Sequence, residues 1–297
     1  MAVYKKTYRP YQGGLTAAWK RFLVIPRYAF EDLRRSRFLT IFYIASFAYP
    51  LIAAITIYLD HNVDAIRLLN LSNLISIDAF YFMSFLGWQS MLAFFLAAFI
   101  GPGQVSPDLA NGALSLYLAR PFSRAEYVLG KMSVLLILMS LMTWIPGLLL
   151  FVLEGYLEPA GWMSGHARIA AGLFFGAWVW ILLASLLALA LSAWVKWRPA
   201  AGALMFGVFW VAGGFGQAIN NVQGTKWGLL LSMPNLIGTV WVRLFEGENP
   251  VSNGGVFFRL DQSGIIPVWA CWASLLGWSL ICLYMLNRKI RGAEVVR

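Results

Sequence analysis

Six long apolar runs recur along the chain, separated by shorter segments that hold most of the charged residues. Each run is close to the roughly 20 residues that an α-helix needs to cross a hydrocarbon core about 30 Å thick. Strands of a membrane barrel would instead alternate apolar and polar positions over about 10 residues. The pattern therefore predicts six transmembrane helices, at residues 38–59, 79–100, 133–153, 169–195, 200–219 and 265–286.

Composition supports the same fold class. The chain is 60% hydrophobic and 12% charged, whereas soluble domains have about 25% charged residues. We therefore predict an all-α integral membrane protein, and we divide it into an N-terminal segment, a transmembrane domain and a basic tail. Their limits are 1–37, 38–286 and 287–297, with an inner loop at 101–132 and a long outer loop at 220–264.

The distribution of lysine and arginine predicts the orientation. The basic residues that share one side of the six spans lie in the N-terminal segment, two loops and the tail: Lys5, Lys6, Arg9, Lys20, Arg21, Arg27, Arg34, Arg35, Arg37, Arg120, Arg124, Lys131, Lys196, Arg198, Arg288, Lys289, Arg291 and Arg297. The other side has Arg67, Arg168, Lys226, Arg243 and Arg259. Since basic loops stay in the cytoplasm, both termini are predicted to be cytoplasmic. The net charge of +10 then indicates contact with anionic membrane lipids, and no nucleic-acid partner is expected.

Two further segments have membrane character. Residues 15–37 are amphipathic and predict an elbow helix in the interface plane, either as a simple anchor or as a contact for a cytoplasmic partner. The outer loop contains an apolar stretch that Pro234 and Gly238 interrupt. It is too short to span and predicts a re-entrant or interfacial hairpin, with Trp227 and Trp241 at headgroup level.

Polar residues are scarce inside the predicted spans. Gln89 and Ser90 lie midway along the second span, Gln217 near the end of the fifth, and Asn220 just beyond it. Ionisable residues are absent from the middle of every span, which weakens the hypothesis of a self-powered secondary transporter. Gln89 has two open interpretations, a hydrogen bond to a neighbouring helix or a contact with substrate.

Small residues and prolines predict how the spans pack. Gly172-x-x-x-Gly176 in the fourth span and the five glycines of the fifth favour close helix contacts, the latter including a contact between subunits. Pro50 and Pro146 are predicted to kink the first and third spans. His61 and His166 fall in separate outer loops, so no metal site is predicted from them.

The inner loop contains a polar insert with helix signals. Ser106-Pro107-Asp108 predicts a helix start, with Ser106 as the N-cap, and this helix would end before Pro121. Ser123 and Glu126 then form a capping box that opens a second helix through Lys131. Glu126 is therefore interpreted as a capping residue and not as a catalytic acid.

The segment "DLANGALSLYLARPFSRAEYVLGK" (108–131) resembles the inner loop of ABC transporter permeases of the ABC-2 exporter type. The resemblance implies a dimer of permease chains, formed by two copies or by two related chains, and a separate ATPase subunit docked under this loop. It assigns that contact to Asp108, Arg120, Pro121, Arg124, Glu126 and Lys131. It also implies that the second and fifth helices border the substrate route, which would place Gln89, Ser90, Gln217 and Asn220 near it.

The resemblance further implies that this chain binds no cofactor and that ATP and Mg²⁺ belong to the partner. In agreement, the nearest match to a phosphate-binding loop, "YVLGKMS", lacks its first glycine and the Ser or Thr after Lys131. The protein is expected to be located in a bacterial plasma (inner) membrane. Two alternatives stay open, an anchoring subunit without transport and a membrane-integral enzyme. The exported substrate stays open, since lipid, polysaccharide, peptide, antibiotic and ion export are all compatible with this family and topology.

Overall fold

The computed structural model describes residues 24–62, 77–113, 123–245 and 266–290. The regular structure in these ranges is helical. In chain order the helices are α1 (Val24–Arg35), α2 (Arg37–Ser46), α3 (Ala48–Asp60), α5 (Ala79–Ile100), α6 (Pro102–Ala110), α8 (Arg124–Met142), α9 (Trp144–Leu157), α10 (Trp162–Gly165), α11 (Ala167–Trp194), α12 (Arg198–Phe206), the π-helix η2 (Gly207–Val211), α13 (Ala212–Gln223), the 3₁₀-helix η3 (Trp227–Leu231), α14 (Met233–Phe245) and α15 (Val268–Lys289).

Six helical segments in the described ranges are long and apolar enough to cross a membrane, which confirms the six predicted spans. They are Arg37–Asp60, Ala79–Ala110, Arg124–Leu157, Ala167–Trp194, Arg198–Gln223 and Val268–Lys289. The second and third spans are longer than predicted, because much of the predicted inner loop at 101–132 belongs to them. The sixth likewise extends to Lys289, beyond the predicted start of the tail at 287.

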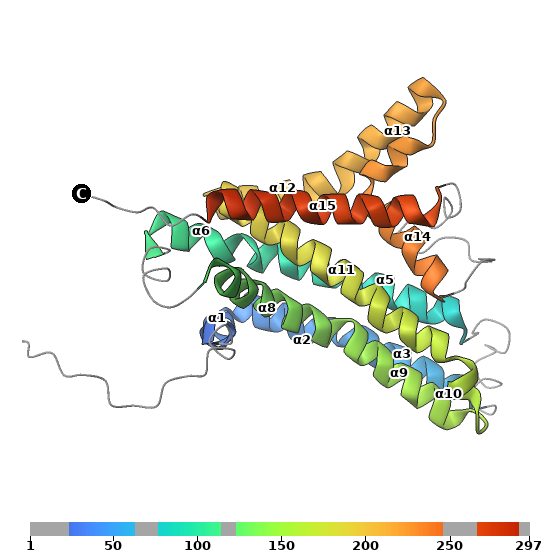
Figure 1. Ribbon diagram of the computed structural model, residues 1–297. Helices are drawn as coiled ribbons and strands as arrows, with labels where there is room; N and C mark the ends of the chain where they lie inside the picture. Colours follow the sequence, from blue (N-terminus) through green and yellow to red (C-terminus); the bar gives the residue numbers. More distant parts are fainter. Residues whose placement is uncertain (1–23, 63–76, 114–122, 246–265, 291–297) are drawn as a thin grey trace, which may run out of the picture.

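The long helices run side by side, with α11 at the centre of the bundle (Figure 1). This helix contacts α5, α6, α8, α9, α12, α14 and α15. In the most apolar stretch of each span, 72% of the residues are buried in α11 but only 11% in Arg37–Asp60. The all-round apolar pattern of α11 therefore reflects contact with protein around most of the helix, whereas the first span leaves most of its apolar side chains on the outer surface of the bundle.

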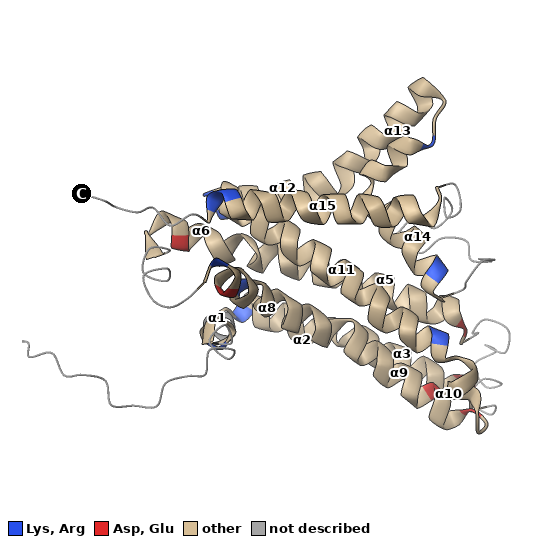
Figure 2. Cartoon of the chain, viewed as in Figure 1, with Lys and Arg blue, Asp and Glu red and all other residues tan. Residues whose placement is uncertain are grey.

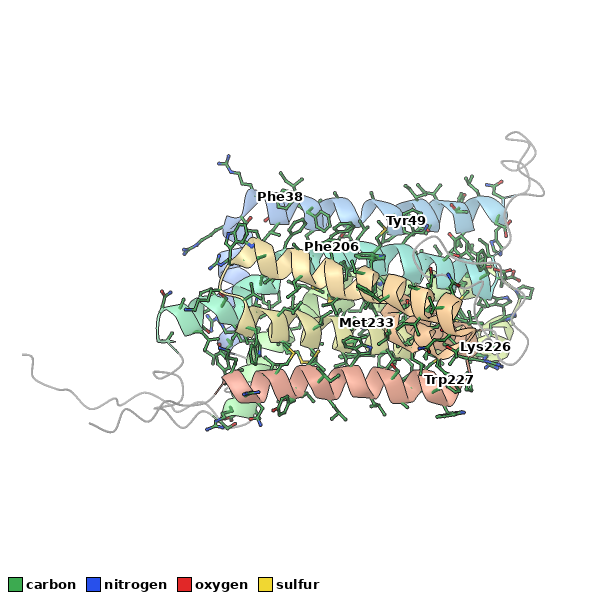
Figure 3. The ribbon with its side chains drawn as sticks, turned by 90° about the horizontal axis from the view of Figure 1, so that it is seen from above. Phe38, Tyr49, Phe206, Lys226, Trp227 and Met233 are labelled. Carbon is green, nitrogen blue, oxygen red and sulfur yellow. The ribbon has the colours of Figure 1, made fainter. Side chains whose placement is uncertain are left out.

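Charged residues gather at the two ends of the bundle, as Figure 2 shows. We call these the α6 end, which carries α1, α6 and the start of α8, and the α10 end, which carries the C-terminus of α9, α10 and the start of α11 (Figure 1). Lysine and arginine dominate the α6 end (Figure 2). Figure 3 views the bundle from above, with Phe38 near the α6 end and Lys226 and Trp227 toward the other.

The first and third spans are interrupted where their prolines remove a hydrogen bond. An α-helical N–H bonds the carbonyl four residues earlier, and proline has no N–H. Pro50 and Pro146 therefore leave the carbonyls of Ser46 and Met142 without a helical donor, and these are the last residues of α2 and α8. Both predicted kinks thus coincide with breaks in the helices.

The α14 helix packs deep against α11 through the Gly172-x-x-x-Gly176 motif. A Cβ atom at Gly172 would lie 2.9 Å from the Phe245 ring, and one at Gly176 would lie 3.2 Å from Trp241. Trp241 Nε1 donates to the Gly176 carbonyl at 2.9 Å. Trp241 therefore packs inside the protein and does not contact lipid headgroups, because its side chain is buried and its polar atom is satisfied by the Gly176 carbonyl.

The predicted outer loop at 220–264 is largely helical where it is described. Its first residues, 220–223, complete α13, and Pro234 stands in the first turn of α14, where a missing N–H costs nothing. Arg168 donates to the carbonyls of Arg243 and Leu244 at the end of α14, at 2.8 and 3.1 Å. Of the two predicted arrangements, this buried α14 fits the re-entrant one.

The α13–η3 hairpin projects from the bundle (Figure 1). Its two arms approach each other at Gly216 and Gly228, where the two backbones face each other with no side chain between them. Asn220 Oδ1 accepts a hydrogen bond from the Gly228 amide at 2.8 Å. The glycine density of the fifth span therefore serves close packing, here within one chain.

Candidate functional site

The polar insert lies at the α6 end, where α6 extends the second span beyond Gly101. The predicted helix start at Ser106 is wrong, because α6 already begins at Pro102 and ends at Ala110. Ser106 is buried within α6, and its hydroxyl donates to the Lys196 carbonyl at 2.9 Å instead of capping a helix. A tertiary hydrogen bond has here replaced the local one that the sequence favours.

Ser192 of α11 holds α6 in place. Its hydroxyl accepts the amides of Val105 and Ser106, each at 3.1 Å, and donates to the Pro102 carbonyl at 2.8 Å. The Ser192 hydroxyl thus bridges the Ser106 amide and the Pro102 carbonyl, which lie one turn apart in α6. The Gly101 backbone lies so close to α11 that a Cβ there would lie 2.5 Å from the Ala188 Cβ.

We expect Ser192→Ala to lower the free energy of unfolding by about 1–2 kcal/mol, because buried amides lose their acceptor and can recover it only in part within α6. Thermal unfolding in detergent and hydrogen exchange of the α6 amides measure the effect. Ser185→Ala is the matched control, since Ser185 is buried on the same helix but reaches only Met139 Sδ at 3.9 Å. Equal losses in the two variants would refute a specific role for Ser192.

Asp108 joins α6 to the start of the third span. Its Oδ2 lies 2.9 Å from Lys131 Nζ and accepts a hydrogen bond from the Tyr127 hydroxyl at 2.7 Å. Tyr127 is buried, and the side chains of Asp108 and Lys131 are only 16% and 13% exposed. Screening by water is therefore weak, and the pair fixes the relative position of α6 and α8.

The predicted capping box is confirmed at the start of α8. The Ser123 hydroxyl accepts the Glu126 amide at 3.2 Å, and the Glu126 carboxylate accepts the Ser123 amide at 2.6 Å. Arg124, the first residue of α8, is exposed. Of the predicted contact residues, Asp108 and Lys131 are thus brought together, whereas Arg120 and Pro121 lie outside the described residues.

A groove of about 560 Å³ opens beside the Asp108–Lys131 pair. Val24, Ile25 and Tyr28 of α1 line it with mostly apolar side chains, and Arg198 of α12 lines it together with the charged pair. The elbow helix therefore borders the same hollow as the polar insert. Ile25, Ala29 and Phe30 of α1 pack against the bundle, while Arg27 and Tyr28 are exposed.

The predicted substrate-route residues are not brought together within one chain. Gln89 and Ser90 are buried, and Gln89 Nε2 donates at 3.1 Å to the Ser46 carbonyl that Pro50 leaves free. This geometry fits the first interpretation of Gln89, a bond between helices. Gln217 and Asn220 instead lie on α13, in the projecting hairpin.

An aromatic cluster that the sequence did not predict joins the second, fourth and fifth spans. The η2 π-helix buries Phe209, whose ring centroid lies 4.8 Å from that of Phe94 and 5.3 Å from that of Trp180. Figure 3 marks Phe206, which lies next to this cluster and 5.0 Å from Phe94. Single π-helical turns are frequent at functional sites, so η2 marks a special position in the fifth span.

A family model of ABC-2 family transporter proteins matches residues 24–231. The match begins with α1 and ends in η3, so it includes both the α6 end and the fifth span. No curated protein matches the chain.

Proposed function

Because the chain belongs to the ABC-2 family of transporter proteins, we propose that it is the membrane-spanning permease subunit of an ATP-driven exporter. It is a multi-pass integral membrane protein, and as a member of this family it is a transport component that is not itself catalytic. A separate ATPase subunit would bind ATP and Mg²⁺, and this chain would convert the movements of that subunit into alternating access.

The α6 end would face the cytoplasm of a bacterium whose plasma (inner) membrane holds the protein. The concentration of lysine and arginine at this end supports that orientation, since basic segments are retained on the cytoplasmic side (Figure 2). The same residues would contact anionic lipid heads. The ATPase subunit would then dock under the α6–α8 junction.

The observation that carries the proposal is the set of bonds that ties α6 to two other spans. Asp108 links it to Lys131 and Tyr127 of the third span, and Ser192 links it to the fourth. Since α6 also continues the second span, a push on this short helix would move three spans together. A permease without its own ATPase requires such a rigid connection, because the movement of the separate ATPase subunit has to reach its membrane spans.

A second permease chain would complete the transporter. The fifth span supports this, because a Cβ atom added at Gly207 or Gly214 would meet no atom within 4 Å, and Phe215 and Val222 expose their side chains. Small residues beside exposed apolar ones favour close helix association in lipid. Gln89, Ser90, Gln217 and Asn220 remain the predicted lining of the route.

Co-purification from the native membrane tests the proposed function. We expect an ATPase subunit to accompany the wild-type chain and to be lost from Arg120→Glu/Arg124→Glu, because reversing two charges of the inner loop would repel the docking partner. Lys226→Glu/Arg259→Glu makes the same change of charge on the predicted outer side and should retain the subunit. Mass spectrometry of the co-purified proteins and an ATPase assay provide the readout.

Two results would contradict the proposal. If no nucleotide-binding protein accompanies any of the three chains, while other membrane complexes survive the same detergent, the anchoring hypothesis replaces transport. If the subunit stays bound to Arg120→Glu/Arg124→Glu as firmly as to wild type, its docking site lies elsewhere.

A further inference from the structure

Three metal-binding side chains meet at the α10 end of the bundle. His61 follows the last residue of α3, Glu154 lies in the last turn of α9, and Glu158 follows that helix. His61 Nε2 lies 3.5 Å from Glu158 Oε1 and 4.0 Å from Glu154 Oε1. One ligand atom from each residue lies within 4.8 Å of the others. The sequence alone predicted no metal site at His61, because α3 and α9 are distant in the chain.

The other ring nitrogen of His61 determines which atom faces the two carboxylates. His61 Nδ1 lies 3.1 Å from the Ile57 carbonyl, and a carbonyl oxygen can only accept. We therefore assign the ring proton to Nδ1, which leaves the lone pair of Nε2 directed at Glu154 and Glu158. Metal-binding histidines commonly hold their second nitrogen on a backbone carbonyl in this way.

Glu154 provides an independent sign that a positive ion belongs here. The residue is 1% exposed, and its Oε2 atom is buried without a hydrogen-bond partner in the described structure. Its Oε1 atom points toward His61, so the carboxylate is oriented into the cluster. A buried carboxylate without a donor is costly, and a bound cation would remove that cost.

The electrostatic surroundings of His61 also favour a cation. Glu154 and Glu158 lie within 4.0 Å of its Nε2 atom, and Asp60 precedes it in the chain. Three acidic residues thus surround one imidazole. With its ring proton on Nδ1, His61 is neutral, so it leaves the negative charge of the two glutamates for a bound cation to balance.

We propose that His61, Glu154 and Glu158 bind a divalent transition-metal ion that links α3 to α9. One imidazole and two carboxylates suit Zn²⁺ among such ions, with the remaining coordination position open to water. Tetrahedral bonds of about 2.0–2.2 Å place ligand atoms about 3.3–3.6 Å apart. The separation of His61 Nε2 and Glu158 Oε1 already meets this value, whereas the Glu154 carboxylate has to move closer to both. Since the first span is the least buried of the six, the ion would fasten its outer end to the bundle.

Metal analysis of the purified full-length chain tests this proposal. The protein is stripped with a chelator in detergent, dialysed against Zn²⁺, and measured for bound metal and for the midpoint of thermal unfolding. We expect about one Zn²⁺ per wild-type chain and a higher midpoint with the metal, because an ion that binds the folded state stabilises it. His61→Asn and Glu158→Gln should each weaken binding at least about tenfold, as even outer-shell losses cost 10–100-fold.

His166→Ala is the matched control, because it removes the other histidine, which hydrogen-bonds the Trp162 carbonyl through Nδ1 away from this cluster. The proposal is overturned if wild type and His61→Asn retain the same amount of Zn²⁺, or if wild type retains none. Retention of Mg²⁺ in preference to Zn²⁺ would contradict the transition-metal assignment. None of these readouts depends on the ATPase subunit, so they stand apart from the test of transport.

Discussion

Replacing Asp108 with alanine is expected to lower the free energy of unfolding by about 2–4 kcal/mol. The change leaves the mostly buried ammonium of Lys131 without its counter-charge and the Tyr127 hydroxyl without its acceptor. Removing one partner of a fully buried ion pair costs about 3–5 kcal/mol, and the slight exposure of this pair reduces the cost. Thermal unfolding in detergent would detect the loss as a lower midpoint.

A double-mutant cycle separates the ion pair from other effects of truncation. Asp108→Ala, Lys131→Ala and the double variant should be non-additive, with the double variant more stable than the sum of the single losses predicts. Arg124→Ala is the control on the same helix, and its exposed side chain should change stability by no more than about 0.5 kcal/mol. Additive losses would show that Asp108 and Lys131 do not act as a pair.

Asp108→Ala also distinguishes two roles of the α6 end in the proposed transporter, the docking of the ATPase subunit and the transmission of its movements to the spans. Asp108→Ala weakens the bond between α6 and α8 but leaves the charges of Arg120 and Arg124 in place. We therefore expect the ATPase subunit to co-purify while its stimulation by the permease falls. If the permease stimulates ATP hydrolysis normally in a folded Asp108→Ala complex, Asp108 does not transmit the movements of the ATPase subunit.

Replacing Gly216 with alanine is expected to open the α13–η3 hairpin, at a cost of about 3 kcal/mol. The new Cβ atom would overlap the Gly228 carbonyl, which is backbone and cannot rotate away. Separation of the arms would also lengthen the bond from the Gly228 amide to Asn220. Hydrogen exchange of that amide, together with thermal unfolding, provides the measurement.

Gly214→Ala is the matched control for this prediction. Gly214 lies two residues away on the same helix, and a Cβ atom there would have no neighbour within 4 Å. In the single chain, alanine there should be neutral or stabilising by up to about 1 kcal/mol, because alanine has the higher helix propensity. Equal destabilisation by the two substitutions would mean that the hairpin tolerates no side chain at all and that close contact with Gly228 is not the cause.

Features that depend on neighbouring residues could be predicted from the chain alone. The six spans follow from the length of the apolar runs, and the capping box of Ser123 and Glu126 from two residues three apart. The breaks at Pro50 and Pro146 follow from a missing N–H and a carbonyl four positions earlier. The family resemblance rests on a continuous segment, 108–131, and the family match agrees with it.

Contacts between distant residues required the tertiary structure. Val105 and Ser192 are 87 residues apart, and Trp241 and Gly176 are 65 apart. Such partners decide whether Ser106 caps a helix or bonds Lys196, and whether Trp241 lies at a membrane surface or inside the bundle. Local propensities are worth about 1 kcal/mol or less per residue, and a buried hydrogen bond can outweigh them.

The chain by itself therefore determined that this is a six-span membrane protein with a capped polar insert at its basic end. The tertiary structure decided which contacts the insert makes, since Asp108 meets Lys131 and Tyr127 only when α6 and α8 pack together. It also decided that His61, Glu154 and Glu158 converge. Hydropathy and capping act over a few residues, whereas the position of a ligand set depends on how whole helices align, which no single segment encodes.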